Sequence, residues 1–158
     1  MIAKTNATDG TNTTLYWGYN LKEQDVPNLE NLTDKIAAKA DYNGKANTAA
    51  IIAGYAALSK DMDSRDMCKV LETYNEGGYT DWYIPACGQL YEFYSNKTAI
   101  EEALTAINGT KFNKSPEGYW SSSECYPSNA WFGGFSDGYI NNNNKGGIYC
   151  VRFVRDLQ

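Results

Sequence analysis

Few side chains in this sequence have the types and spacing needed for chemistry. Histidine, the usual proton carrier near neutral pH, is absent from the 158 residues. The four cysteines are widely spaced without a CxxC motif, so we expect no structural zinc; they are Cys68, Cys87, Cys125 and Cys150. Their spacing fits either a Cys125–Cys150 disulfide or four free thiols. These features favour binding over acid–base catalysis.

A calcium loop is the remaining metal candidate, because DYNG at residues 41–44 resembles the start of one. An EF-hand loop that begins at Asp41 needs a carboxylate at its twelfth position, where Ile52 stands. The Glu-Pro-Asn ligand motif of calcium-dependent animal lectins is also missing, and the one Ser-Pro-Glu, residues 115–117, precedes the expected strands. We therefore expect an Asx-turn at Asp41, no metal and no cofactor.

Charge and hydropathy exclude two classes of partner. The formal net charge is −5, and lysine and arginine form no cluster, which argues against nucleic acid. No apolar run reaches transmembrane length and no charged-then-apolar leader follows Met1, so we expect no direct membrane insertion. Any export signal or anchor would then belong to a larger parent protein or an assembly partner such as a pilus or fibre.

The length suits one domain over residues 1–158. Residues 1–13 are polar and rich in Thr and Asn, and we expect a loose leader there, followed by a first strand in TLYWGYN, residues 14–20. From Tyr119 onward, short pieces rich in aromatic, Ser, Gly and Asn residues predict strands. Helical patterns lie between these regions, so the sequence predicts an α+β fold with its sheet mainly in the C-terminal third.

Three helical regions are expected between the first strand and Tyr119. Residues 27–58 have a mainly helical pattern, in which Asn47 caps the second part, and the shared face of the first part is Leu29, Leu32 and Ile36. A second helix is expected from Ser64 to Gly77, with Met67, Val70, Leu71 and Tyr74 on its buried face. After Pro85 the pattern continues, and Thr98 with Glu101 predicts a capping box.

The second half of the chain carries a set of motifs in a defined order. GGYTDWYIPACGQLYEFY, residues 77–94, is followed by YWSSSE, AWFGGFSDG and VRFVRD. In this order they resemble the adhesin-type domain at the C-terminus of collagen-like bacterial surface proteins, within it the branch from gut bacteria and phages, over about residues 40–158. The matching positions are Gly78, Asp81, Trp82, Pro85, Leu90, Trp120, Ser122, Ser123, Glu124, Trp131, Phe135, Gly138, Arg152 and Arg155.

This resemblance implies a C-type-lectin-like fold, in which buried tryptophans supply core mass. Residues 121–124 are expected to hydrogen-bond either loop backbone or the guanidinium groups of Arg152 and Arg155. Some members of the branch resemble the variable proteins of diversity-generating retroelements, in which adenines in a 3′ repeat are rewritten. AAY codons for Asn then become NNY codons, which encode many residues but never Lys, Glu, Gln, Met or Trp.

The C-terminal region can be tested for this codon signature. Lys, Glu, Gln, Met and Trp together account for 30 of the 158 residues, so a 26-residue window should hold about five of them. Residues 125–150 hold two, Trp131 and Lys145, both at positions that the family keeps fixed. The run of four asparagines at 141–144 therefore indicates diversification; the alternative is a polar hairpin built from turn-forming residues.

A diversified surface needs variable residues that face solvent and a backbone held by other residues. We expect Trp131, Phe135, Val151 and Phe153 to point inward. The predicted ligand-binding residues form an outward patch: Tyr126, Ser128, Asn129, Phe132, Gly134, Tyr139, Asn141, Asn142, Asn144, Gly147, Ile148 and Tyr149. Tyr, Ser, Gly and Asn also dominate antibody paratopes.

The sequence thus predicts a non-catalytic display domain that binds a protein or surface glycan, on a phage particle, a bacterial cell surface or in secreted form. An ordinary, non-diversified adhesin domain is the alternative. Formylglycine-generating enzymes share the lectin-like fold and act through cysteines, but no reactive pair of cysteines is expected in a common pocket here.

Overall fold

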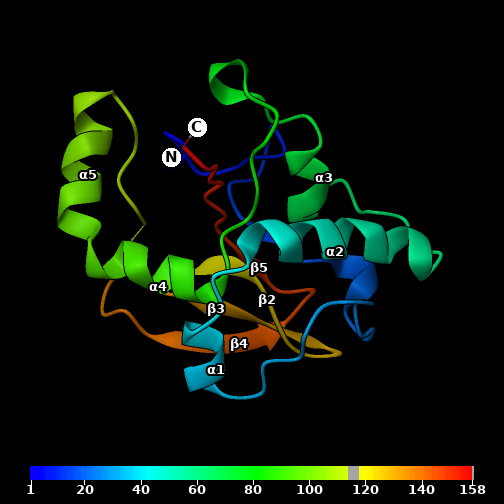
Figure 1. The fold of residues 1–158 in the computed structure, drawn as a ribbon. Coiled ribbons are helices and arrows are strands. Elements are labelled where there is room, and N and C mark those ends of the chain that lie inside the picture. The colour runs from blue at the N-terminus through cyan, green and yellow to red at the C-terminus, as the bar shows by residue number, and fades with distance from the viewer. Residues whose placement is uncertain (114–117, 158) are drawn as a thin grey trace.

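The computed structural model describes residues 1–113 and 118–157; the Ser-Pro-Glu at 115–117 lies outside the described residues. Along the chain the elements are β1 (Leu15–Tyr16), α1 (Lys35–Lys39), α2 (Gly44–Ala57), α3 (Met67–Leu71), α4 (Cys87–Ser95), α5 (Lys97–Ala106), β2 (Tyr119–Tyr126), β3 (Asn129–Gly133), β4 (Ile140–Asn144) and β5 (Ile148–Tyr149). Short 3-10 turns cover Tyr19–Leu21 and Glu76–Gly78. Helices precede most of the strands, so the predicted α+β class is confirmed (Figure 1).

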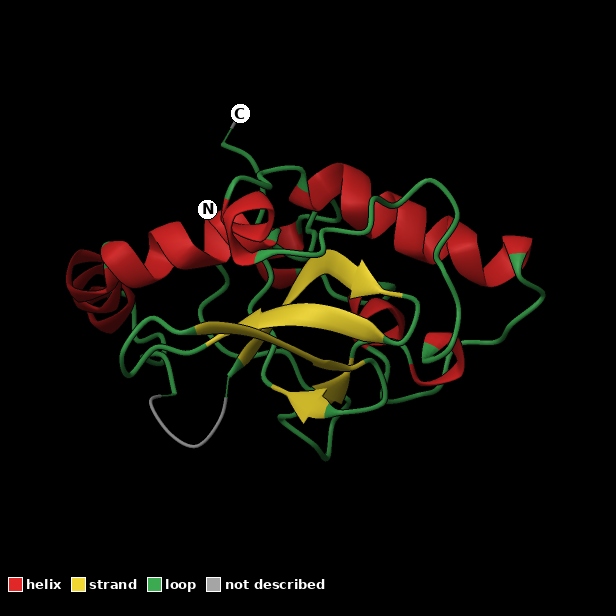
Figure 2. Ribbon diagram, turned by 90° about the horizontal axis from the view of Figure 1, so that it is seen from below, coloured by secondary structure: helices red, strands yellow, loops and turns green. Residues whose placement is uncertain are grey.

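The strands form two antiparallel sheets. One has the order β2-β3-β4, and the other pairs β1 with β5, so the start of the chain joins its end. Figure 2 shows the longer helices gathered along one side of the strands. On the opposite side of the molecule from the two termini lies β4, at the margin of its sheet (Figure 1).

The predicted helix over residues 27–58 is wrong in its first part. Residues 27–34 are not helical, and α1 begins only after Asp34, whose carboxylate accepts hydrogen bonds from the amides of Ile36 and Ala37 at 2.9 Å. Ile36 is 84% exposed and shares no buried face. The second part also begins earlier than expected, because Asn47 lies inside α2 and its side chain donates to Asp41 at 2.8 Å.

Two further helix boundaries differ from the sequence pattern. The third helix, α3, spans five residues and ends at Leu71, well before Gly77, and Asp66 instead of Ser64 stands at its start. The capping box at Thr98 is also wrong, since Glu101 turns inward and accepts a hydrogen bond from the amide of Phe112 at 3.3 Å. A buried acceptor for a loop amide stabilises tertiary structure instead of the helix end.

The core of the described residues has three hydrophobic clusters, and the buried tryptophans lie in two of them. Trp82, Trp120 and Trp131 are all buried, and so are the four residues that were expected to point inward: Trp131, Phe135, Val151 and Phe153. These predictions are confirmed. Aromatic side chains of this size contribute most of the apolar area that a domain of this length can bury.

The first residues of the chain are packed, contrary to the expected loose leader over residues 1–13. Ala3 and Ala7 are buried, and their amides donate to the carbonyls of Phe153 and Val151 at 2.9 and 2.8 Å. The side chain of Asn6 accepts two hydrogen bonds from the Arg152 guanidinium, at 2.9 and 2.7 Å. The polar composition of residues 1–13 therefore gave no sign that this segment is fixed by backbone hydrogen bonds to the end of the chain.

Candidate ligand-binding surface

The predicted surface is built on the β3–β4 hairpin, whose register decides which side chains share a face. Trp131 lies opposite Asn142, and Phe132 lies opposite Asn141. Directly opposite residues project to the same face and successive residues to opposite faces. The asparagines of β4 therefore alternate between two faces, and the expected single outward patch is divided in two.

One face is aromatic. The ring of Phe132 stacks on Tyr149 with centroids 4.1 Å apart and meets Tyr139 edge-on at 5.8 Å. Both tyrosines are half-buried, and the Tyr149 hydroxyl accepts a hydrogen bond from Asn143 at 2.9 Å. Burial raises the pKa of the Tyr139 hydroxyl above its ordinary value, so the phenol of Tyr139 is neutral at physiological pH.

The other face is polar. Tyr126 is 44% exposed and lies opposite Asn129 in the β2–β3 register. The amide of Asn129 donates to the side chain of Asn142 at 2.8 Å. Ser128 is half-buried in the connecting turn, and Asn144 is exposed at the end of β4. This face therefore presents hydroxyl and amide groups around one exposed tyrosine.

Two residues of the expected patch are not on the surface. Phe132 is 6% exposed and belongs to the main core cluster. Gly134 is also buried, and a Cβ atom there would overlap the ring of Tyr139. The prediction that these two positions face outward is wrong. The ring of Phe132 packs against Tyr139 and Tyr149, and the ring of Tyr139 occupies the space that a side chain at position 134 would need.

The sequence pattern missed surface residues that lie beside the predicted ones. Asn143 is exposed and bonded to Tyr149, and the alternation along four asparagines could have included it. Ile148 pairs across the small sheet with Tyr16, whose ring lies 5.0 Å from Tyr19. No local signal in the sequence indicated that residues 16 and 19 reach this surface, since the pairing of β1 with β5 is long-range.

A buried ion pair holds the loops of this surface. Lys145 and Glu124 are both fully buried and form a salt bridge. The Lys145 ammonium also donates to the carbonyls of Gln24 and Pro127, each at 2.7 Å, and its backbone amide donates to Ser128 at 2.9 Å. Lys145 therefore ties the turn between β2 and β3 and the turn after β4 to Gln24 and Glu124, which explains a lysine inside the depleted window.

Burial governs the protonation of this pair. It raises the pKa of the Glu124 carboxyl and lowers the pKa of the Lys145 ammonium, while their mutual attraction acts in the opposite direction on each. One oxygen of Glu124 and the hydroxyl of Ser122 have no hydrogen-bond partner among the residues that the structure describes. The pair therefore stabilises the structure at this position.

The serine-rich strand β2 hydrogen-bonds to β3 of the hairpin through a side chain as well as through its backbone. The Ser121 hydroxyl donates to the Trp131 carbonyl at 2.8 Å, and the Trp131 indole donates to the carbonyl of Leu32 at 2.7 Å. Of the two expected roles for residues 121–124, bonding to loop backbone is confirmed by Glu124, whose carboxylate accepts from the amide of Val26 at 3.2 Å. Pairing with the arginines is wrong, since Arg155 bonds Asp81 at 2.7 and 3.0 Å and Arg152 is bonded to the N-terminal segment.

The four cysteines are buried, and Cys125 is a free thiol, so the Cys125–Cys150 disulfide is not formed. The structure does bring Cys87 and Cys125 into one hydrophobic cluster, which the sequence did not indicate. Burial raises the pKa of Cys87 to about 12 and that of Cys125 to about 11. Both therefore remain protonated and are poor nucleophiles at neutral pH.

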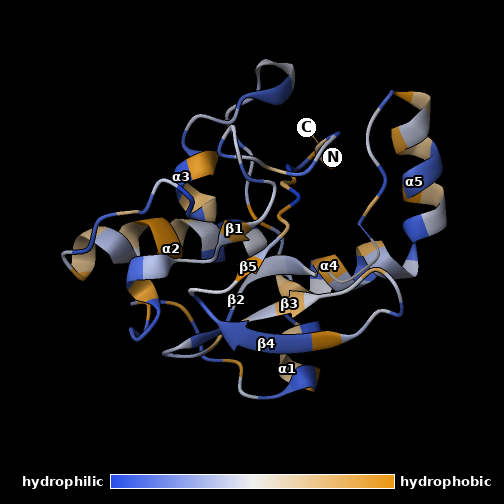
Figure 3. Ribbon diagram, turned by 180° about the vertical axis from the view of Figure 1, so that it is seen from behind, coloured by the Kyte–Doolittle hydropathy of each residue, from blue (hydrophilic) through white to orange (hydrophobic). Residues whose placement is uncertain are grey.

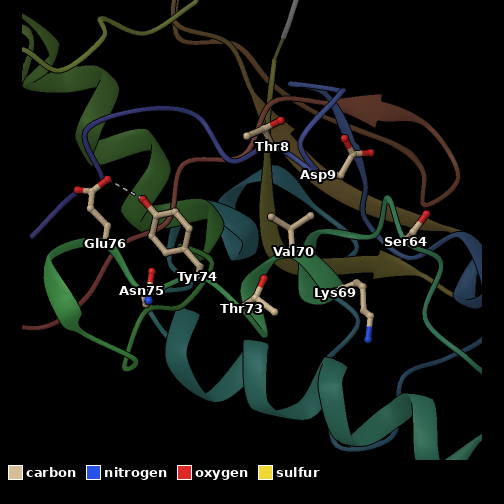
Figure 4. Close-up of a pocket in the computed structure, with 9 residues that line it drawn as sticks. All are labelled: Thr8, Asp9, Ser64, Lys69, Val70, Thr73, Tyr74, Asn75 and Glu76. Carbon is tan, nitrogen blue, oxygen red and sulfur yellow. Dashed lines mark hydrogen bonds between the residues drawn. The ribbon is translucent and has the colours of Figure 1, made fainter.

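A pocket of about 480 Å³ lies away from the predicted surface (Figure 4). Its lining is Thr8, Asp9, Ser64, Lys69, Val70, Thr73, Tyr74, Asn75 and Glu76. The charged groups are engaged in local structure: Glu76 accepts from Tyr74 at 2.8 Å, Lys69 pairs with Glu72, and hydrogen bonds from Asn12 lower the pKa of Asp9. The lowered pKa of Asp9 disfavours it as a general base, and the Glu76 carboxylate is already engaged by Tyr74.

A second cavity of about 480 Å³ lies between the chain ends, beside Ile2, Phe93 and Val154. Within residues 1–113 and 118–157, no three His, Cys, Asp or Glu side chains are grouped so that they could hold a metal ion. The expected Asx-turn at Asp41 is confirmed, because its carboxylate accepts from the amide of Asn43 at 2.9 Å. None of the described helices is both long and apolar enough to span a bilayer.

The β3–β4 hairpin, its buried ion pair and the paired chain ends belong to one α+β fold. The sequence model for the Lcl C-terminal domain matches residues 6–155, so the chain belongs to the Lcl C-terminal domain family. No curated protein matches the sequence.

One solved structure has a similar fold, a fimbrial protein from Bacteroides ovatus ATCC 8483. The TM-score is 0.67 at 17% sequence identity, and the match covers 89% of this chain but 33% of that chain. This chain thus corresponds to about a third of the fimbrial protein. At this identity the likeness concerns the fold.

Proposed function

We propose that this chain is a non-catalytic, surface-displayed binding domain with an adhesin-like role, and that its ligand contacts the β3–β4 hairpin and the neighbouring turns. The observation that carries the proposal is the division of labour within residues 125–150. Trp131 and Lys145 are buried and fix the hairpin. Asn141 on the hairpin is exposed, and so are Tyr126 and Ile148 beside it. Such a division lets contact residues change without loss of the fold.

Family membership and the fold likeness to a fimbrial protein support display on a bacterial surface or fibre. Under this proposal the domain is carried by a larger parent or an assembly partner. The proposal also includes a C-type-lectin-like fold for the domain, and a phage particle as the alternative carrier to a bacterial surface. The ligand is a protein or a surface glycan, since the surface combines tyrosine rings with amide and hydroxyl groups.

Binding can be tested on intact bacterial cells with the purified, fluorescently labelled domain. The triple variant Tyr126→Ser, Tyr139→Ser and Tyr149→Ser should lose at least about tenfold in binding, because rigid aromatics contribute most contact energy. Tyr42→Ser is the matched control, since Tyr42 is also exposed but lies outside the hairpin. Equal loss in the control, or full binding by the triple variant with its fold intact, would exclude this surface. Protease and periodate treatment of the cells separate protein from glycan ligands.

Diversification of this surface by a retroelement is the finer part of the proposal. It is supported by the depletion of Lys, Glu, Gln, Met and Trp in residues 125–150 and by the burial of the two exceptions. The burial of Gly134 and Phe132 restricts the variable set to the remaining positions. The gene sequence tests it: a near-identical downstream repeat that differs at adenines, beside a reverse transcriptase gene, is expected. Without such a repeat the domain is an ordinary adhesin domain with the same binding surface.

Two other functions are less well supported. A cysteine-dependent enzyme needs an accessible thiolate, and burial raises the pKa of Cys87 and Cys125 well above neutrality. A calcium lectin would be stabilised by its ion: with a dissociation constant near 10 μM, 1 mM calcium adds about 2.7 kcal/mol. We expect no change in the thermal midpoint between excess calcium or zinc and chelator, and a clear rise with metal would revive the lectin function.

A further inference from the structure

The outer edge of β4 is formed by the run of four asparagines, and β3 is its partner in the sheet order β2-β3-β4. Two backbone hydrogen bonds show which residues form the hydrogen-bonded pairs of this ladder. The amide of Gly134 donates to the carbonyl of Tyr139, and the amide of Lys145 donates to the carbonyl of Ser128, both at 2.9 Å. Hydrogen-bonded pairs alternate in an antiparallel ladder. The backbone groups of residues 141 and 143 therefore face β3, and those of Asn142 and Asn144 point away from the sheet.

These outward amides are occupied by the side chains of the preceding residues. The amide of Asn142 donates to the side-chain oxygen of Asn141 at 2.9 Å, and the amide of Asn144 donates to that of Asn143 at 2.8 Å. The carbonyl of Asn144 accepts from Gly147 at 2.7 Å. The asparagines at 141 and 143 thus act as local caps on the free edge of their own strand.

The cap at Asn143 is held from both ends of its amide group. Its oxygen accepts from Asn144, and its nitrogen donates to the hydroxyl of Tyr149 at 2.9 Å. Tyr149 is in turn stacked on the buried ring of Phe132. The orientation of this cap is therefore set by the fixed aromatic face and is not a random rotamer of a surface residue.

Within the described strand β4, the sequence and the register supply no other protection of this edge. Free edge strands are usually blunted by charged residues, proline or a bulge, because their unpaired backbone groups pair with other chains. Residues 139–144 contain no charge and no proline, and the register of β3 with β4 has no shift. The nearest charge, Lys145, is turned inward to Glu124.

We propose that the Asn141 and Asn143 side chains close the β4 edge against strand pairing with a second copy of this chain. A second copy is the fitting occupant because the strand is self-complementary. About a two-fold axis through Asn142, two antiparallel β4 strands bring outward positions opposite outward positions, as an isologous contact requires. Asparagine then faces asparagine across the pair, an arrangement that forms amide ladders. This inference depends on the β4 geometry and is independent of the ligand.

The test compares the double variant Asn141→Ala/Asn143→Ala with wild type and with Asn142→Ala. Alanine and asparagine are both disfavoured in strands, so the double variant gains no strand propensity. Asn142→Ala removes an asparagine whose side chain accepts from Asn129 and caps no edge amide. At low protein concentration, amide hydrogen exchange at 142 and 144 should be about fivefold faster in the double variant, as expected for the loss of one net hydrogen bond at each amide.

As concentration rises, the double variant should form a dimer by analytical ultracentrifugation, while wild type and Asn142→Ala stay monomeric. In that dimer the amides at 142 and 144 should become slower to exchange than in wild type. Unchanged exchange at low concentration would show that the side chains are not caps. A double variant that stays monomeric, or a dimer that protects other amides, would overturn the β4 pairing, as would a strand-forming peptide that binds while the variant stays monomeric.

Discussion

Lys145 and Glu124 carry opposite charges that are both removed from solvent. Loss of either residue therefore leaves the charge of the other buried and unpaired. Lys145→Met should cost about 3–5 kcal/mol of unfolding free energy, because it leaves a buried carboxylate without its cation. Adding Glu124→Gln should restore part of the loss, since the amide is neutral and still accepts from Val26. Urea unfolding measures both, and a double variant no more stable than Lys145→Met would show that the charge is not the cause.

The same pair gives a pH signature. Burial raises the folded-state pKa of Glu124 above its ordinary value of 4.5, so protonated Glu124 favours the folded state. A raised pKa contributes stability that is present below the unfolded value and lost as the pH rises through the folded value. The attraction of Lys145 lowers the pKa of Glu124, so Lys145→Met raises that pKa further; the loss of stability in the variant should therefore be smallest below pH 4.5 and grow above it.

Phe132 and Tyr126 separate the interior of the hairpin from its surface. Phe132→Ser should cost at least about 3–5 kcal/mol, because it removes a ring from the main core cluster. Tyr126→Ser should stay within about 0.5 kcal/mol, as most exposed substitutions do. Thermal unfolding of both single variants checks this. A large effect at Tyr126 would mean that its ring contributes to the fold and is not free to contact a ligand.

At the scale of elements, the strands were predicted better than the helices, for a physical reason. Alternation and turn residues are local signals, and they marked β2, β3 and β4 correctly. Helix ends depend on which side chain accepts the free amides, and the sequence predicted Glu101 as a cap although its carboxylate accepts from the amide of Phe112, eleven residues away. The strand β5 stops at Tyr149 because the following residues divide their pairing among three distant segments.

One of those segments is locked to the chain end by Asp81 and Arg155. Their two hydrogen bonds, at 2.7 and 3.0 Å, hold the loop before α4 against the C-terminal segment of the chain. The bond from Arg155 lowers the pKa of Asp81 below its ordinary value of 3.8. A lowered pKa contributes stability that is present above the unfolded value and lost as the pH falls through the folded value.

Asp81→Asn should therefore be less stable than wild type near neutral pH, and the difference should narrow as the pH falls below 3.8. Thermal midpoints of both proteins across this range measure the difference. Asparagine keeps the shape of the side chain, so the comparison isolates its charge. A difference that stays constant with pH would mean that the ion pair contributes nothing beyond its hydrogen-bond geometry.

For the molecule as a whole, closure of the fold depends on contacts between the two chain ends, which composition could not reveal. The first residues look like a solvated leader, yet their alanines are small enough to lie flat against residues 151–153. The candidate surface was predictable to the extent that it is local. Its division into two faces follows from the alternation along the β3–β4 hairpin, whereas its buried ion pair and its extension to Tyr16 come from contacts between segments that are distant in the sequence.

The N-terminal segment supplies the acceptors for a buried cation. Arg152 is fully buried, and its guanidinium donates to the side chain of Asn6 and to the carbonyls of Ala3, Lys4 and Thr110. The Tyr119 hydroxyl also donates to Asn6 at 3.0 Å. One side chain therefore links the first residues, the strand β2 and the end of the chain.

Asn6→Ala should cost about 1.5–3 kcal/mol, the range for hydrogen bonds to a charged group, because the buried guanidinium loses its side-chain acceptor. Asn12→Ala is the matched control, since Asn12 bonds only Asp9 within its own turn and should change stability by less than about 0.5 kcal/mol. Chemical denaturation of the two variants measures the contrast. If Asn6→Ala were as stable as Asn12→Ala, the segment would be the loose leader that its composition suggests, and the closure of the fold would have to rest on residues 15–157.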